Sequence, residues 1–157
     1  MGKHLKKTMH EDMEASLTVI NQGVYDMVTT QDQLLRMKLS SDLAVASEML
    51  ANAGGAKLAE DQVSWEAVNQ LTGIPSEVSL PKMMVGQTWL GQNRDTNEPS
   101  PVVDKVRDLV GGTCTIFQRM NSAGDMLRVS TNVATKDGQR AIGTYIPAKG
   151  NDGSPSE

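Results

Sequence analysis

Aromatic residues, cysteine and histidine are scarce in this chain of 157 residues. The one cysteine, Cys114, excludes an internal disulfide and a cluster of thiolate metal ligands. The two histidines, His4 and His10, do not share one helical face, and no HExxH motif accompanies them. The phosphate-binding patterns GxxxxGKS/T and GxGxxG are missing as well. These gaps argue against an enzyme and against a bound metal or cofactor.

The chain also lacks the features of nucleic-acid-binding and membrane-spanning proteins. Its net charge of −4 leaves no basic surface for nucleic acid, and it contains no run of 18 apolar residues. No hydrophobic segment follows Lys3, Lys6 and Lys7, so the first residues do not form a signal-peptide pattern. We therefore expect any contact with a membrane to be made by segments absent from this sequence.

The length is that of one domain that can bury a core. We expect a long helix at residues 5–52, a sheet-bearing region at residues 62–148 and a flexible tail at residues 149–157, which is rich in Gly, Pro and Ser. Ten methionines partly replace the missing aromatic residues as material for the core.

The first third of the chain has the periodicity of a single helix, which Gly54 and Gly55 end. Its apolar positions alternate four and three apart, which is a heptad pattern with one polar member. This heptad stripe comprises Met13, Leu17, Ile20, Val24, Met27, Gln31 and Leu34. A second stripe, displaced by one residue, comprises Leu35, Leu39, Leu43, Ala46 and Leu50.

Two interpretations fit this helix. About 48 residues of helix would reach roughly 70 Å, about twice the diameter of a small domain. The helix can be an amphipathic element packed along its own sheet, or a stalk that pairs with a second copy in a homodimer. We favour the stalk, since a helix of this length extends beyond one small domain.

The region after the helix is less regular. Residues 63–68 alternate well enough for a strand, and residues 78–85 form a second candidate. Pro81 interrupts that second run, which argues for an edge position or the beginning of a strand. Residues 91–101 have the composition of a loop, and residues 101–109 read as a short helix.

Three segments near the C-terminal end have the alternation of an antiparallel meander. Residues 121–125 form a plausible hairpin loop, and Asp137-Gly138 is a strong signal for a tight turn. Gly143 inside the third segment suggests a bulge. The three predicted strands are residues 114–120, 126–133 and 140–146.

A polar stripe follows this predicted meander. Alternation places Arg128, Ser130 and Asn132 on one face of the second strand, with Arg119 and Arg140 on its neighbours. An arginine fork with hydroxyl and amide partners is a common way to hold a small carboxylate. The alternative is that the stripe is only the solvated face of an antiparallel sheet. Both interpretations stay open on the residues alone.

Four short sequence segments of the same region resemble those of a known family. The phrases match in order and spacing the Cache sensor modules of bacterial chemotaxis receptors and sensor kinases, with the Cache 3/Cache 2 fusion subtype as the best fit. The resemblance is strongest over residues 80–148 and looser along the helix. The four phrases are VVDKV, GGTCTIFQR, RVSTNV and KDGQRAIGTYI.

The resemblance implies an α+β fold in which a long N-terminal helix packs on a PAS-like antiparallel sheet. It implies a sensor without enzymatic activity, in the periplasmic or extracellular portion of an inner-membrane receptor. It also implies a small-molecule ligand such as an organic acid, held on the sheet. Together with the polar stripe, this makes Arg128 the expected ligand-binding residue, with Phe117 and Trp89 as candidate walls of the pocket. The helix would run along a dimer interface and carry the signal.

One departure from the family concerns the end of the sheet. After a phrase like GTYIPA, Cache modules usually continue with a helix and two further strands of a five-stranded sheet. We therefore expect a partial sensor domain whose sheet is incomplete at its C-terminal end. The alternative function is a dimerisation or interaction module that binds no ligand, in which the helix acts and the sheet is scaffold.

Overall fold

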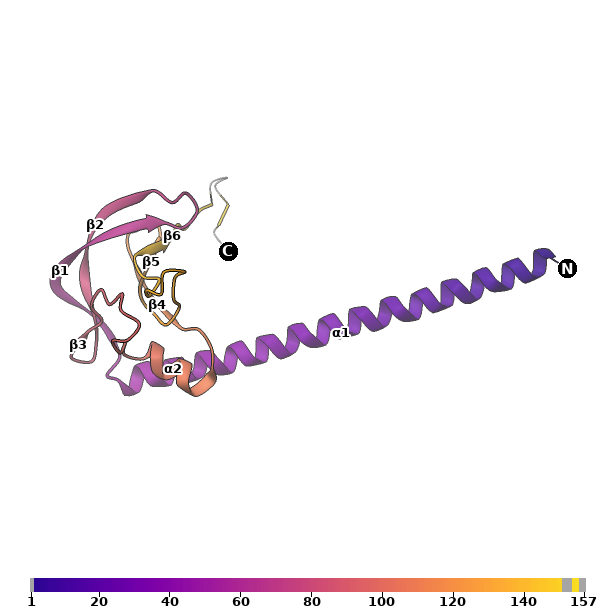
Figure 1. Cartoon of the computed structure of the whole chain (residues 1–157), viewed down its shortest axis with the longest axis horizontal. Coiled ribbons are helices and arrows are strands. Elements are labelled where there is room, and N and C mark those ends of the chain that lie inside the picture. Colours follow the sequence, from indigo (N-terminus) through magenta and orange to yellow (C-terminus); the bar gives the residue numbers. More distant parts are fainter. Residues whose placement is uncertain (1, 151–153, 156–157) are drawn as a thin grey trace. The chain divides into compact units, whose positions relative to one another are not determined.

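The computed structural model describes residues 2–150, 154 and 155, with side chains of the first helix from Lys6 onward. The chain divides into two compact units, Met1–Ser41 and Asp42–Glu157. Helix α1, Gly2–Asn52, runs through the first unit and ends in the second (Figure 1). The single long helix expected at residues 5–52 is therefore confirmed.

The first unit is helical throughout its described residues, and its apolar side chains are exposed. Met13, Ile20 and Leu34 of the heptad stripe are 56%, 60% and 60% exposed. Ion pairs four residues apart, such as Arg36 with Asp32, accompany the stripe on the helix surface. The stripe thus presents an apolar surface that no described residue buries.

Two glycines end α1 as the sequence predicted. Gly54 and Gly55 both have positive φ, and the N–H of Gly55 donates to the carbonyl of Leu50 at 2.9 Å. A Cβ added to Gly54 would lie 2.7 Å from the Cα of Gly86. One added to Gly86 would meet the carbonyl oxygen of Ala53. The main chain after the helix end therefore passes close to the main chain at Gly86, directly after β2.

The chain then forms a long hairpin of β1, Ala56–Asn69, and β2, Pro75–Val85, followed by the short β3, Thr88–Trp89. The β1–β2 register shifts between Leu58 and Gln62, and Gln62 lies opposite Pro81. The irregularity in the ladder thus coincides with the residue that has no N–H to donate. Both strands predicted in this region are confirmed, and both are longer than their alternation indicated.

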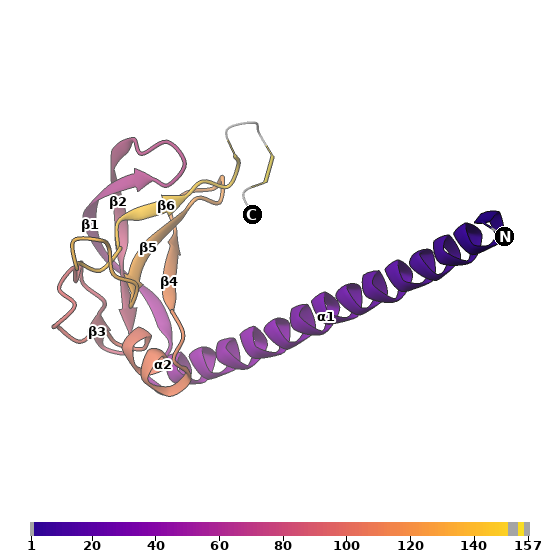
Figure 2. The ribbon, with the colours of Figure 1, turned by 45° about the vertical axis from the view of Figure 1, so that its right-hand side comes forward.

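After the short helix α2, Val103–Val110, the meander consists of β4, Thr115–Arg119, β5, Met126–Thr131, and β6, Thr144–Ile146. Figure 2 shows these three strands side by side. The third strand is shorter than expected because Gly143, at φ +84°, interrupts the extended chain. Arg140 makes only an isolated bridge, to Ala134.

All described strands join one curled sheet in the order β3-β2-β1-β6-β5-β4. Every pair is antiparallel except β1 and β6, so the sheet is mixed rather than purely antiparallel as the family resemblance implied. Because β6 pairs with β1 as well as with β5, the described strands form one continuous sheet.

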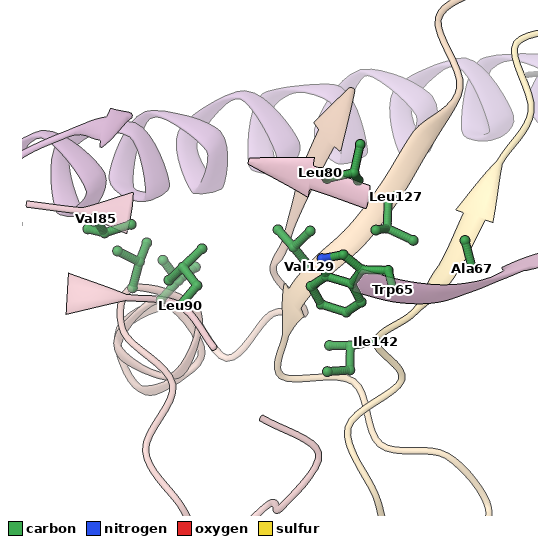
Figure 3. Close-up of a cluster of buried hydrophobic side chains, with 10 residues drawn as sticks. Trp65, Ala67, Leu80, Val85, Leu90, Leu127, Val129 and Ile142 are labelled. Carbon is green, nitrogen blue, oxygen red and sulfur yellow. The ribbon is translucent and has the colours of Figure 1, made fainter. Parts of the chain in front are cut away.

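The core of the second unit lies between the β1–β2 hairpin and the meander. Figure 3 shows the Trp65 indole with Val129 and Ile142 near it. Residues in the last turns of α1, including Ala46 and Leu50, pack against this cluster. The α+β, PAS-like fold is thus confirmed. The part of α1 that packs on the sheet is its end.

The tail expected to be flexible is described only in part. Residues 151–153, 156 and 157 lie outside the described residues. Lys149 and Pro155 form an isolated antiparallel bridge, and the N–H of Gly150 donates to the carbonyl of Ser154.

Candidate functional site

A β-bulge divides the polar stripe that alternation predicted on β5. Phe117 of β4 pairs with Arg128, whereas the preceding residue, Ile116, pairs with Ser130. Neighbouring residues of β4 point to opposite faces, so Arg128 and Ser130 do as well. Val129 is the extra residue of the bulge, and it is buried. The shared face expected for Arg128 and Ser130 is therefore wrong.

The side chains of Ser130 and Asn132 form hydrogen bonds with residues that precede, begin and follow α2. The Ser130 hydroxyl is buried and lies 2.8 Å from that of Ser100. Asn132 accepts from the N–H of Cys114 at 2.9 Å and donates to the carbonyl of Val103 at 2.8 Å. Both side chains thus have protein partners in the described structure.

Arg140 is 2% exposed and has no donor left for a ligand. Its two terminal nitrogens donate to the two carboxylate oxygens of Asp104 at 2.9 and 2.8 Å. Its remaining N–H groups donate to the carbonyls of Asp95, Glu98 and Thr131. A guanidinium has five N–H donors, and all five are engaged here.

The partner carboxylate, Asp104, is held in its charged form. Burial opposes its ionisation, but hydrogen bonds from Arg140 and the N–H of Ser100, with the charges of Arg140 and Arg107, outweigh that cost. The pKa of Asp104 is consequently below its ordinary value. The pair closes a polar network inside the second unit, which accounts for the burial of an arginine.

Arg119 also serves the local fold. It lies exposed at the end of β4 and donates to the carbonyls of Asn121 and Ser122 in the hairpin loop. Trp89, the other aromatic considered as a pocket wall, lies on the opposite edge strand, where Lys82 approaches its ring at 5.3 Å. Neither residue is brought to Arg128 by a direct contact or by strand pairing.

Arg128 and Phe117, in contrast, are brought together on the outer face of the meander. The guanidinium carbon of Arg128 lies 5.7 Å from the centre of the Phe117 ring, and one terminal nitrogen donates to the carbonyl of Ala141 at 3.2 Å. Burial lowers the pKa of the Arg128 guanidinium, which nevertheless stays charged. Its Nε is enclosed and has no hydrogen-bond partner among the described residues.

Thr144 is the neighbour that the sequence analysis missed. β5 and β6 pair Met126 with Ile146 and Leu127 with Tyr145, and the N–H of Gly143 then donates to the carbonyl of Arg128 at 2.9 Å, so Thr144 begins the strand beside Arg128. The Thr144 hydroxyl is likewise enclosed without a partner in the described residues. Its place in the third predicted strand was available from alternation, but the pairing of that strand with β5 was not.

A positive donor, a hydroxyl and an aromatic ring therefore gather on adjoining strands. Leaving a buried polar atom unpaired costs about 1–3 kcal/mol, and a bound acceptor would remove that cost. A carboxylate is an acceptor for which both a guanidinium N–H and a hydroxyl are suitable donors, and its charge is opposite to that of Arg128. Among the described residues no cluster of His, Cys, Asp and Glu could hold a metal ion. His10 pairs with Glu14 on exposed helix, and the side chain of His4 lies outside the described residues.

Comparison with known families decides what kind of module carries this arrangement. The Cache 3/Cache 2 fusion domain matches residues 3–155. The chain belongs to this family. Cache domains are extracellular sensor modules of signalling receptors, and the family is one of sensors rather than enzymes. No curated protein and no solved structure matches the chain.

This Cache domain contains no candidate membrane span in the part that the structure describes: none of its helices combines the necessary length and apolar character. The family match covers the long helix as well as the sheet, so both units of the chain belong to the sensor module.

Proposed function

We propose that this Cache domain senses a small carboxylate at Arg128 and passes the signal through α1 to a signalling domain of a longer receptor. The receptor is of the bacterial chemotaxis type, and this domain is its periplasmic portion. The site comprises Arg128, Thr144 and Phe117, whereas Ser130, Asn132, Arg119 and Arg140 hold the surrounding chain.

The pair of enclosed, unpartnered groups on neighbouring strands carries this proposal. Arg128 Nε and Thr144 Oγ1 belong to residues on the paired strands β5 and β6. Structural arginines of this domain show the opposite pattern, since Arg140 uses all of its donors within the protein. Family membership supports the same function, because Cache domains generally bind small molecules.

Calorimetric titration of organic acids and amino acids against the domain tests the site. Charge-assisted hydrogen bonds contribute about 1.5–3 kcal/mol, so Arg128→Ala should weaken the binding of any carboxylate found by about 10- to 150-fold. Thr144→Val keeps the shape of the side chain and should weaken binding by about fivefold.

Arg107→Ala is the matched control, because Arg107 lies on α2 and pairs with Asp104 and Asp108 instead. It should leave affinity unchanged. If Arg128→Ala bound the same ligand as tightly as the unaltered domain, the outer face of β5 would be only a solvated surface.

The exposed heptad stripe favours a second function, dimerisation through α1. Apolar residues at heptad spacing are half or more exposed along the first unit, which is the surface that a parallel helix pair buries. We infer a homodimer in which the stripe faces its copy. This role would stand even if the sheet bound no ligand.

Replacing Ile20 and Val24 together with Glu should convert this dimer to a monomer, because four carboxylates would face one another across the seam. Sedimentation velocity gives the mass of each species. Thr18→Glu with Gln22→Glu adds the same charge at outward positions and should leave the dimer intact. An unaltered domain that sediments as a monomer would remove the dimer hypothesis.

A further inference from the structure

Val102 has a backbone conformation that β-branched residues avoid. Its φ of 69° and ψ of −62° make it the one non-glycine residue with positive φ in the described chain. The N–H of Val103 donates to the carbonyl of Pro101 at 2.8 Å, which closes a three-residue γ-turn of the rare, strained kind. Strain of this type persists only where neighbouring contacts enforce it.

Hydrogen bonds on both sides of Val102 enforce that conformation. Before it, the Ser100 hydroxyl meets Ser130 at 2.8 Å. After it, Asn132 donates to the Val103 carbonyl, and Asp104 binds both Arg140 and the N–H of Ser100. The polar residues that alternation assigned to a ligand therefore hold the segment from Ser100 to Asp104 in its strained state.

The side chain of Val102 faces the last turns of α1. It is 3% exposed and lines a groove of about 240 Å³ between the helix end and the beginning of β4. The groove leaves room for this side chain to change position. Its other apolar walls include Leu43, Ala46, Leu50, Cys114 and Ile116.

We propose that the segment Ser100–Asp104 is a two-state connector between the sheet and the end of α1. In the observed state the sheet holds Val102 strained against the helix. When the hydrogen bond of Ser130 to Ser100 or that of Asn132 to Val103 breaks, Val102 returns to negative φ and its side chain leaves the groove. The last turns of α1 then lose a packing partner. This inference rests on the proposed sensing function, for which it supplies the link to the helix.

Paired substitutions at Val102 test the strain. Val102→Ala and Val102→Gly both remove the side chain, but only glycine accepts positive φ without strain. We expect the Gly variant to melt about 3 °C above the Ala variant. At Val106, buried in regular α2, the order should reverse, since glycine weakens a helix interior relative to alanine. The same order at both positions would overturn the proposal.

Hydrogen exchange tests the connection to α1 without any ligand. Ser130→Ala removes the Ser100–Ser130 bond and should speed exchange at amides 46–52 by about tenfold, equivalent to about 1.4 kcal/mol. Ser100→Ala removes the same bond from the other side and should do the same. In a Val102→Gly background, where no strain remains to be released, neither change should affect these amides.

Tyr145→Phe is the control, because it removes one remote hydrogen bond, from Asn69 to the phenol. It should leave amides 46–52 as they are. Equal acceleration by Ser130→Ala in the unaltered domain and in the Val102→Gly background would overturn the connector. Since exchange is measured on the free domain, this result is independent of whether a carboxylate binds at Arg128.

Discussion

The two units of this chain are stabilised by contacts of different range. In the first unit, side chains bond four residues along the same helix, as Gln22 does with Asp26 and Arg36 with Asp32. In the second unit, Arg140 binds Asp104, which is 36 residues away. Local pairs can be lost one at a time, whereas a long-range network fails as a whole. A single change should thus have small effects in the first unit and large ones in the second.

The largest effect is expected at Arg140. Arg140→Ala leaves the Asp104 carboxylate partly buried without its main partner, and breaking a buried pair costs about 3–5 kcal/mol. Urea unfolding of the second unit measures the loss. Arg119→Ala removes an exposed arginine with two loop contacts and should change stability by no more than about 0.5 kcal/mol. Similar losses from both changes would mean that the network is not cooperative.

The pH dependence of stability should show the same difference between the two units, with an effect of intermediate size. Because the pKa of Asp104 is lowered in the folded state, its stabilisation is present above the unfolded value of about 3.9 and is lost as pH falls through the lower folded value. Asp104→Asn should cost about 1.5–3 kcal/mol at neutral pH, and the gap to the unaltered domain should close below about pH 4.

Unfolding measured from pH 7 to pH 2 follows that gap. Asp32→Asn in the first unit removes an exposed pair and should cost less than about 1 kcal/mol at any pH. A constant gap between Asp104→Asn and the unaltered domain would show that the charge of Asp104 does not stabilise the fold.

The smallest effect compares one glycine from each unit. A Cβ at Gly23 or at Gly55 would meet no atom within 4 Å, so crowding does not distinguish them. Gly23 lies inside α1, where Gly23→Ala should stabilise the helix by about 0.5–1 kcal/mol. Gly55 has φ +72°, so Gly55→Ala should destabilise the second unit. Circular dichroism during thermal unfolding gives both signs, and stabilisation by both changes would contradict the helix-end geometry.

Local patterns predicted most of the fold. The periodicity of α1 and the glycines at its end are properties of adjacent residues, as are the alternation of β1 and β5 and the hairpin loop at residues 121–125. The family resemblance was likewise carried by short contiguous phrases. These elements could be located without knowledge of what lies next to them.

The candidate site could be predicted only in part, because its arrangement depends on distant partners. Nothing in the residue types of β5 marks Val129 as the extra residue of a bulge, and that one residue turns Ser130 away from Arg128. Arg140 is buried because Asp104 of α2, Thr131 of β5 and two loop carbonyls, those of Asp95 and Glu98, meet around it. Thr144 could be identified only from its unpartnered hydroxyl and from the pairing of β6 with β5.

The close approach of the main chain at Gly54 and Gly86 gives the end of α1 a fixed point about which it can rotate. A Cβ on either glycine would collide with main chain of the other segment, and the N–H of Gly86 donates to the carbonyl of Gly55 at 3.0 Å, which holds the two backbones together. A push on the helix at Ala46 would therefore act about 12 Å from a fixed point. A displacement of about 1 Å there would tilt the last turns by about 5°. The contact therefore converts a small lateral shift into a rotation of the helix end rather than a translation along its axis.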